Sequence, residues 1–113
     1  MSDVTIYHNP KCSKSRKTLA LIKESGQAVK VIEYLKTPPT AKVLAHVIKT
    51  LKISASDIVR NKEFSGLEVG IPEDQSQWIA LMVANPQIIE RPIVLHGDRV
   101  CIGRPPELVL HIL

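Results

Sequence analysis

The sequence predicts an α/β protein with about four strands, and two observations favour this fold class. Near the N-terminus, a short β-branched segment is followed by a segment with helical spacing of its apolar residues and then by a second β-branched segment. Near the C-terminus, two short apolar segments flank a turn signal and precede a further helical segment. With 113 residues, of which 44% are hydrophobic, the chain is long enough for one core without disulfide bonds. The predicted order is β-α-β, a helical middle, and β-β-α.

The N-terminal segments predict a parallel strand pair. Residues 3–7 form the first expected strand, and residues 13–25 form a helix that ends at Gly26, a residue suited to a left-handed helix stop. Residues 29–34 are short and β-branched and predict the second strand. A strand-helix-strand unit of this length implies a right-handed crossover, so these two strands should be parallel neighbours.

The helical middle begins after the stiff connector Thr37-Pro38-Pro39-Thr40, whose last residue is expected to be a helix N-cap. Apolar residues then recur at helical spacing and define one face of a helix: Val43, Leu44, Val47, Ile48 and Leu51. Residues 54–57 resemble a capping box and predict a short helix that reaches Arg60.

Two glycines punctuate residues 64–71, which are therefore predicted to be irregular. Pro72 is expected to start another helix, which Asn85-Pro86 ends. Four residues are predicted to form its inner, buried face: Trp78, Ile79, Met82 and Val83.

Period-two alternation returns in the C-terminal part. Residues 93–95 and 100–102 flank His96-Gly97-Asp98-Arg99, which contains a Gly-Asp hairpin signal. The last helix is predicted over residues 107–113, with three side chains available for burial: Leu108, Leu110 and Ile112.

Composition restricts the classes of function. The net charge of +4 suits an anionic ligand, but the 15 basic residues are scattered and only four aromatic residues are present, so nucleic-acid binding is not expected. No apolar run has the length of a membrane span, and the N-terminus shows no signal-peptide pattern, so we expect a cytoplasmic protein without membrane contact. Cys12 and Cys101 should then be reduced thiols. We expect no bound cofactor and no metal site.

The loop at residues 7–16 has the clearest chemical signal in the chain. Pro10 blocks continuation of the first strand, so Cys12 or Ser13 should begin the helix, where backbone N–H groups lack partners. The helix dipole favours a thiolate there, and so do three neighbouring cations: Lys11, Lys14 and Arg16. His8 could add charge or a hydrogen bond. The alternative is a buried structural cysteine, which would require hydrophobic neighbours rather than these.

Four sequence blocks together resemble the thioredoxin fold and, more closely, the glutaredoxin-coupled arsenate reductase family (ArsC-like). The blocks occur in family order: Ile6-Tyr7-His8-Asn9-Pro10-x-Cys12-x-x-Ser15-Arg16, Tyr34-Leu35-x-Thr37-Pro38-Pro39, Arg91-Pro92-Ile93-Val94 and Arg104-Pro105. The resemblance implies one thioredoxin-like domain over residues 1–113, a three-layer α/β/α arrangement with a four-stranded mixed sheet. The helical insertion would occupy about residues 40–86, between the second and third strands.

The resemblance also implies which residues act as the nucleophile and which bind the oxyanion. Cys12 would be the nucleophile that attacks arsenic and releases water, and Arg60, Arg91 and Arg104 would hold the oxyanion, since an arginine fork matches two oxygens at once. Arg91 and Arg104 each stand beside a proline at the edge of a strand, whereas the segment around Arg60 matches the family only loosely. A solvated surface charge is the alternative for each.

Three further residues receive roles from the resemblance. Pro92 would be a cis proline that presents backbone groups beside Cys12. His8 would help to lower the pKa of Cys12, with a histidine merely hydrogen-bonded at a strand end as the alternative. Ser15 would either donate to the thiolate or cap the helix. Cys101 lies between Val100 and Ile102 and is expected to pack in the core or at a sheet edge.

Three hypotheses for function follow. The first is an arsenate reductase that uses glutathione as co-substrate and glutaredoxin as partner. The second is a glutathione-dependent thiol reductase with another substrate, and the third is a non-catalytic protein-binding regulator on the same fold. Regulators of this kind that bind RNA polymerase commonly contain Cys-x-x-Cys in the first loop, whereas position 15 here is Ser. The presence of all three candidate arginines favours the first hypothesis.

Overall fold

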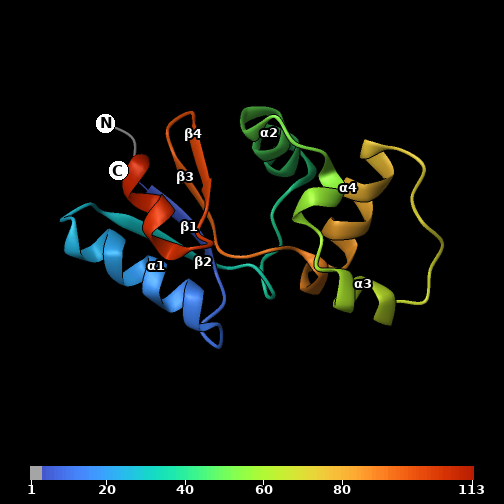
Figure 1. Ribbon diagram of the computed structural model, residues 1–113, viewed down its shortest axis with the longest axis horizontal. Coiled ribbons are helices and arrows are strands. Elements are labelled where there is room, and N and C mark those ends of the chain that lie inside the picture. Colours follow the sequence, from blue (N-terminus) through green and yellow to red (C-terminus); the bar gives the residue numbers. More distant parts are fainter. Residues whose placement is uncertain (1–3) are drawn as a thin grey trace. The chain divides into compact units, whose positions relative to one another are not determined.

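The computed structural model describes residues 4–113, which fall into two compact units (Figure 1). One unit contains the described residues up to Thr37 together with Arg91–Leu113, and the other contains Pro38–Glu90. The helical insertion predicted at about 40–86 falls within the second unit. The single domain over residues 1–113 stays a prediction.

The first unit is built around a four-stranded mixed sheet, as predicted. Its strands lie in the order β2-β1-β3-β4, with β1 parallel to β2 and antiparallel to β3, and β3 antiparallel to β4. This is the thioredoxin-like arrangement that the sequence predicts. The elements of this unit are β1 (Val4–His8), α1 (Ser13–Glu24), β2 (Val29–Glu33), β3 (Ile93–His96), β4 (Arg99–Ile102) and the 3₁₀ helix η3 (Pro106–His111). Residue 3, the predicted start of the first strand, lies outside the described residues.

Local sequence signals explain the ends of these elements. Helix α1 has Cys12 as its N-cap and Ser25 as its C-cap, and Gly26 follows with a φ of +80°, the left-handed stop that was predicted. The β3–β4 hairpin turns at Gly97, whose φ is +64°, so the hairpin prediction is also confirmed.

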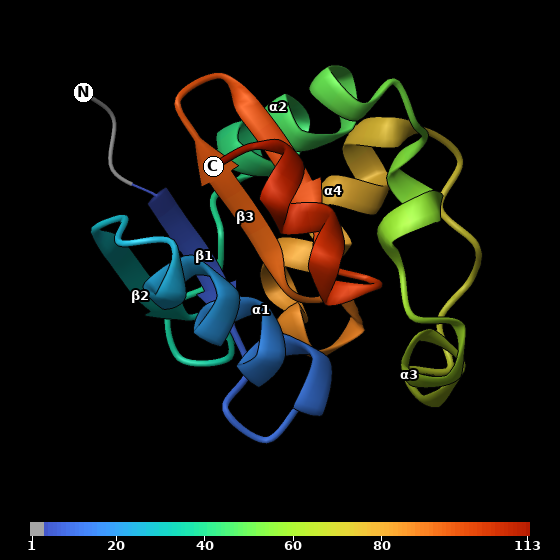
Figure 2. The same ribbon diagram turned by 60° about the vertical axis from the view of Figure 1, so that its left-hand side comes forward.

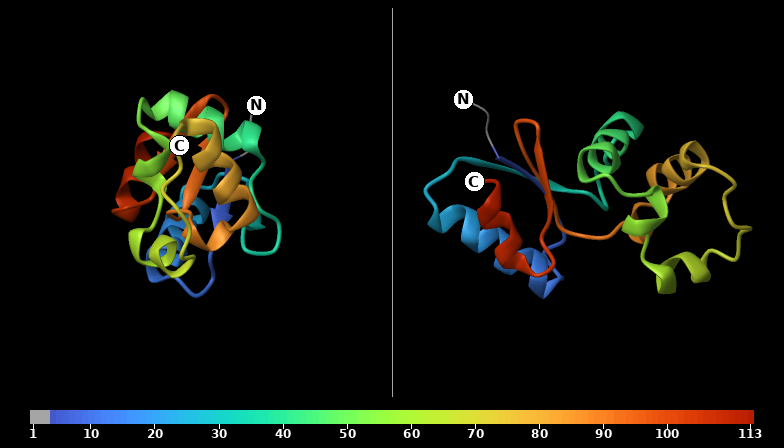
Figure 3. Two further views of the ribbon diagram at one scale, coloured as in Figure 1. Left: turned by 90° about the vertical axis from the view of Figure 1, so that its right-hand side faces the viewer. Right: turned by 45° about the horizontal axis from the view of Figure 1, so that its top comes forward.

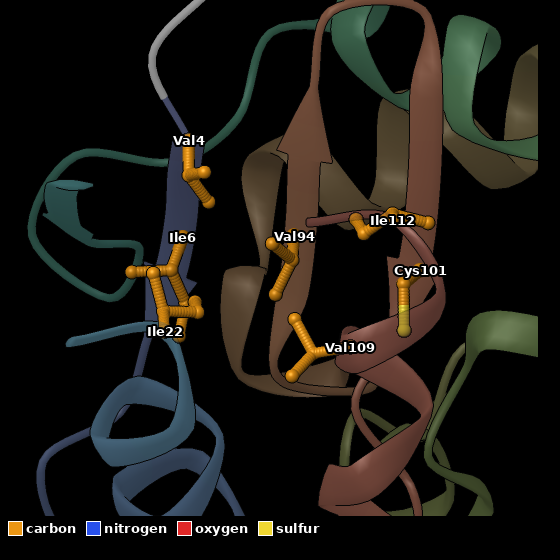
Figure 4. Close-up of a cluster of buried hydrophobic side chains, with 7 residues drawn as sticks. All are labelled: Val4, Ile6, Ile22, Val94, Cys101, Val109 and Ile112. Atoms are coloured by element: carbon orange, nitrogen blue, oxygen red, sulfur yellow. The ribbon is translucent and has the colours of Figure 1, made fainter. Parts of the chain in front are cut away.

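One face of the sheet is covered by α1 and η3, which lie side by side (Figures 2 and 3). Buried side chains from every layer meet between them and the sheet, as Figure 4 shows: Val4, Ile6, Ile22, Val94, Cys101, Val109 and Ile112. The core of this unit therefore connects helix α1, whose N-cap is Cys12, to the central strands.

The C-terminal helix differs from its prediction in kind. It is a 3₁₀ helix, so the buried positions repeat every three residues and fall on Val109 and Ile112. Leu108 and Leu110, which were expected to be available for burial, are 41% and 53% exposed. The prediction was right for Ile112 and wrong for the other two.

The second unit, residues 38–90, is helical, as predicted. Its elements are α2 (Ala41–Leu51), the 3₁₀ helix η1 (Ala55–Ile58), α3 (Asn61–Gly66), α4 (Gln75–Ala84) and the 3₁₀ helix η2 (Pro86–Ile88). Thr40 caps α2 by accepting a hydrogen bond of 3.2 Å from the Val43 N–H, and the capping box predicted at Ser54 and Asp57 is present. Both predicted caps are confirmed.

Two predictions for this unit were wrong. Residues 64–66 were expected to be irregular but end helix α3, whose six residues are too few to show an apolar repeat. The helix expected to start at Pro72 starts at Gln75 instead, because Asp74 accepts a hydrogen bond of 2.9 Å from the Gln77 N–H and acts as N-cap.

Helix α4 also buries less of its predicted inner face than expected. Ile79 and Met82 are buried, whereas Trp78 and Val83 are only half-buried. The Trp78 ring instead packs on Phe64 of α3, with ring centroids 5.0 Å apart. No helix within residues 4–113 is long and apolar enough to cross a membrane.

Candidate active site

Cys12 is held by a turn between β1 and α1. Its N–H donates to the Asn9 carbonyl at 3.0 Å, and its carbonyl accepts from the Arg16 N–H at 3.0 Å, which begins the helix. The Asn9 side chain also accepts from the Lys11 N–H at 3.0 Å, so the loop is braced from within. The thiol therefore stands at the N-terminus of α1, the position that the sequence predicts for it.

The environment of Cys12 favours its thiolate. Burial by itself raises the pKa of the thiol, but the backbone N–H of Ser15, the charge of Arg91, the backbone N–H of Lys14 and a hydrogen bond from the Arg91 side chain all lower it. The net effect is a pKa below the ordinary value. The helix N-terminus and one arginine thus outweigh the burial of a side chain that is only 9% exposed.

His8 and Ser15 form a buried pair. His8 Nδ1 lies 2.5 Å from Ser15 Oγ, and Ser15 Oγ also accepts from the Asn9 N–H at 3.0 Å. The contact with Cys12 that lowers its pKa comes from the backbone N–H of Ser15, while the Ser15 hydroxyl fastens the end of β1 to the first turn of α1.

The pKa of His8 is lowered, mainly because the ring is buried. The negative charge of Glu33 raises this pKa, and the positive charges of Lys23 and Arg16 lower it further. The lowered pKa favours the neutral ring, which can act as the hydrogen-bonding partner of Ser15. The hydrogen bond with Ser15 is observed, and a role of His8 in lowering the pKa of Cys12 stays a prediction from the resemblance.

Arg91 and Arg104 are brought together by the sheet. Ile93 on β3 is the register partner of Ile102 on β4, so the segments that precede β3 and follow β4 run together. Arg104 donates from its guanidinium to the Arg91 carbonyl at 3.1 Å. The Arg91–Pro92 and Arg104–Pro105 peptide bonds are both cis. The structure thus places Cys12, Arg91, Pro92 and Arg104 in one unit, with Arg91 acting directly on the thiol.

Arg60 belongs to the second unit, where it is the N-cap of α3. Its N–H donates to the Ile88 carbonyl at 2.7 Å, and its guanidinium forms an ion pair of 2.6 Å with Glu63. Its role in holding an oxyanion stays a prediction from the resemblance.

Cys101 is buried in the core of the sheet unit, opposite Val94, as the sequence predicts. Burial raises the pKa of this thiol from 9.0 to about 11. The pKa values of the two cysteines are therefore shifted in opposite directions. Within residues 4–113 no group of three or more His, Cys, Asp or Glu side chains is placed to hold a metal ion.

The sequence analysis assigned no role to three residues that shape the site. Asn9 closes the turn before Cys12, and the Asn-Pro pair is a turn signal that could have indicated it. Thr18 and Gly103 contact each other across 85 residues of sequence, and no local pattern predicts such a contact.

Comparisons with known proteins agree on one family. The model of the ArsC family matches residues 7–112. The uncharacterized protein YfgD of Escherichia coli (strain K12) is 45% identical, and the alignment covers 97% of this chain and 96% of that one. The arsenate reductase of the same strain is 42% identical, over 100% of this chain and 82% of the relative.

A solved structure, the arsenate reductase from Vibrio cholerae, is 40% identical and superposes with a TM-score of 0.84, over 99% of this chain and 98% of that chain. The match extends over the first loop, both sheet segments and the helical middle. The chain therefore belongs to the ArsC family.

Proposed function

We propose that this protein is an arsenate reductase in which Cys12 is the nucleophile and glutathione and glutaredoxin supply the reducing equivalents. The observation that supports this most directly is the contact of Arg91 with the Cys12 thiol at the N-terminus of α1. A thiolate and a guanidinium side by side offer a nucleophile and a bidentate oxyanion ligand at one point. Relatives named arsenate reductase at 42% identity support the same substrate.

In this proposal Arg91 and Arg104 bind arsenate oxygens and Cys12 attacks the arsenic. An S–As bond forms, and an arsenate oxygen leaves as water after protonation. Reduction of As(V) to As(III) needs two electrons, which a pair of thiols supplies when they are oxidised to a disulfide. Cys12 is one of these thiols, and we assign glutathione as the other. Arsenite then leaves, and glutaredoxin regenerates Cys12 from the mixed disulfide. Such a cycle needs a reducing compartment, which favours the cytoplasm.

Arg60 would be the third oxyanion ligand, and Pro92 would present its backbone beside Cys12. We assign His8 and Ser15 supporting roles, because their hydrogen bond fixes the turn that holds the thiol.

The test is arsenate-dependent oxidation of NADPH in a mixture of glutathione, glutaredoxin and glutathione reductase. We expect turnover by the parent protein and none by Cys12→Ser. Ser13→Ala is the matched control, because Ser13 is the exposed neighbour of Cys12 in sequence. Absence of arsenate-dependent turnover in the folded parent protein would refute the proposal.

The same mixture separates the alternatives. Turnover of a small mixed disulfide without turnover of arsenate would identify a glutathione-dependent thiol reductase. Absence of both reactions, together with capture of RNA polymerase subunits or another protein partner, would identify a binding protein.

A further inference from the structure

Gly103 lies at a junction of three segments of the sheet unit. A Cβ atom at this position would stand 2.5 Å from Thr18 Oγ1, 2.8 Å from Pro92 Cγ and 3.0 Å from Thr18 Cγ2. Distances below about 3 Å do not occur in relaxed packing, so even alanine would push these groups apart. The φ of Gly103 is not in the left-handed region, so close approach rather than backbone conformation explains the glycine.

Hydrogen bonds hold the same three segments together. The Gly103 N–H donates to the Pro92 carbonyl at 3.0 Å. The Thr18 hydroxyl, which is fully buried, donates to the Lys14 carbonyl at 2.8 Å and lies 3.5 Å from the Gly103 carbonyl. Helix α1, the segment before β3 and the segment after β4 therefore meet at Gly103. They approach so closely there that a single added methyl group would not fit.

Each of these segments holds one part of the candidate site. Cys12 caps the helix that contains Thr18, Arg91 directly precedes Pro92, and Arg104 directly follows Gly103. A shift of the helix against the two loop segments would change the distance between the thiol and both guanidinium groups.

We infer that Gly103 is a positioning residue: its missing side chain sets the separation between the Cys12 thiolate and the Arg91–Arg104 pair. The inference rests on the proposed oxyanion site but not on arsenic chemistry. The competing explanation is that Gly103 only allows α1 to pack on the sheet, in which case its replacement lowers stability and leaves the site unchanged in the folded protein.

Gly103→Ala tests the inference, with Gly70→Ala as matched control because a Cβ at Gly70 meets nothing within 4 Å. Far-UV circular dichroism and thermal unfolding give the folded fraction. The informative readouts are the pH dependence of Cys12 alkylation, the phosphate concentration that half-protects Cys12 from alkylation, and kcat/KM for arsenate.

We expect folded Gly103→Ala to alkylate with a midpoint at higher pH than the parent, because Arg91 is displaced from the thiolate. The half-protecting phosphate concentration should rise and kcat/KM should fall, each by about 10- to 100-fold, the cost of an ångström-scale misplacement. Gly103→Ala/Thr18→Ala should recover part of this loss, since it removes both Thr18 atoms that the new Cβ meets. A folded Gly103→Ala with the alkylation profile and phosphate protection of the parent would overturn the inference.

If Gly103→Ala does not fold, the double variant Gly103→Ala/Thr18→Ala provides the test, because the new Cβ then meets only Pro92 Cγ among these atoms. We expect weaker phosphate protection in the folded double variant than in Thr18→Ala alone, and equal protection would overturn the inference. A parent protein that phosphate protects but that does not reduce arsenate would remove the proposed function and leave the positioning role standing.

Discussion

At the scale of single residues, the two cysteines show that burial alone does not decide the state of a thiol. Cys12 and Cys101 are 9% and 6% exposed, yet the pKa of the first is lowered and that of the second is raised to about 11. The difference lies in what replaces water around the sulfur. Cys12 meets two backbone N–H groups and Arg91, whereas Cys101 meets aliphatic side chains of the core.

This contrast predicts selective modification. With iodoacetamide at pH 7, Cys12 should be alkylated well before Cys101, and its rate should follow a pKa below the ordinary value, since the thiolate is the reactive form. Mass spectrometry of peptides taken over a pH series measures both rates. Faster labelling of Cys101, or a Cys12 profile centred at the value of a free thiol, would contradict the assignment.

Arginine geometry gives a second prediction at this scale. Arg91→Lys and Arg104→Lys keep the charge but lose the planar fork, and a hydrogen bond of this charged type contributes about 1.5–3 kcal/mol. We therefore expect the phosphate concentration that half-protects Cys12 to rise about 10- to 100-fold in each variant. Arg99→Lys is the control, because Arg99 is exposed at the start of β4. Parental protection in both test variants would show that these arginines do not bind the oxyanion.

At the scale of elements, the connection between β1 and α1 is stabilised by hydrogen bonds of the Ser15 side chain rather than by the side chain of the N-cap residue. Cys12 is the N-cap of α1, but its side chain makes no capping hydrogen bond of the usual kind. The backbone N–H groups of Lys14 and Ser15 act on its sulfur by favouring the thiolate. The Ser15 hydroxyl instead joins His8 and the Asn9 N–H. The connection is thus stabilised while the thiol stays available.

Ser15→Ala separates these two functions. The variant leaves His8 and the Asn9 N–H without their partner in a buried place, which should lower the free energy of unfolding by about 1–3 kcal/mol. The pKa of Cys12 should nevertheless stay low, because the backbone N–H of residue 15 is unchanged. Urea unfolding and the alkylation profile measure the two effects, and Ser13→Ala, at an exposed position in the same turn, is the control. A Cys12 pKa that returned to the ordinary value would show that the hydroxyl itself acts on the thiolate.

Elements with strong local signals were predictable from sequence. The strand-helix-strand unit, the hairpin at Gly97 and the caps at Thr40 and Ser54 follow from residues within a few positions of one another. Helix α3 has no such signal, because its six residues are too few for an apolar repeat, and its Phe64 packs on Trp78 of another helix. The 3₁₀ form of η3 likewise depends on how it packs, and it moves burial from Leu108 and Leu110 to Val109.

The candidate site also contains some features that local sequence predicts and others that depend on contacts between distant residues. Cys12 follows from a strand-loop-helix pattern, although the charge that lowers its pKa is that of Arg91, which is distant in sequence. The two arginines were assigned only through the resemblance of their proline-flanked motifs to the family. The partner of the Ser15 hydroxyl and the role of Gly103 could not be predicted, because the first depends on the rotamer in the turn and the second on a contact between residues 18 and 103.

At the scale of the whole molecule, the core and the site respond differently to pH. Because the folded state raises the pKa of Cys101 from 9.0 to about 11, it favours the protonated thiol. The associated stabilisation is fully present below pH 9 and is lost as the pH rises from 9 to 11, by about 2–3 kcal/mol. Cys101→Val, which removes the titrating group at similar volume, should lack this part of the alkaline loss.

Urea unfolding at pH 8, 9 and 10.5 measures the difference, with both proteins in the Cys12→Ser background so that only Cys101 titrates as a thiol. If the free energy of unfolding fell equally with pH in the two proteins, burial would not raise the pKa of Cys101.

The strand order of the sheet predicts that the protein cannot complete a catalytic cycle with its own two thiols. Cys101 pairs with Val94, which pairs with Ile6, so two strand spacings of 4.7–4.9 Å, or about 9–10 Å, separate β4 from β1. A disulfide needs Cα atoms about 4.4–6.8 Å apart, and Cys12 lies beyond the end of β1 rather than opposite Cys101. The raised pKa of Cys101 also leaves few thiolates at neutral pH to attack an adduct on Cys12.

We therefore expect Cys101→Val to keep most of the parental kcat/KM for arsenate when glutathione and glutaredoxin are supplied. Without glutaredoxin, Cys12 should accumulate as a mixed disulfide with glutathione, which intact-mass measurement and peptide mapping identify because the thiol of Cys101 stays free. Ser15 stands where a Cys-x-x-Cys protein has its resolving thiol, so no nearer candidate exists among residues 4–113. A Cys12–Cys101 disulfide formed during turnover, or loss of activity in a folded Cys101→Val variant, would show instead that the sheet opens to let the two thiols pair.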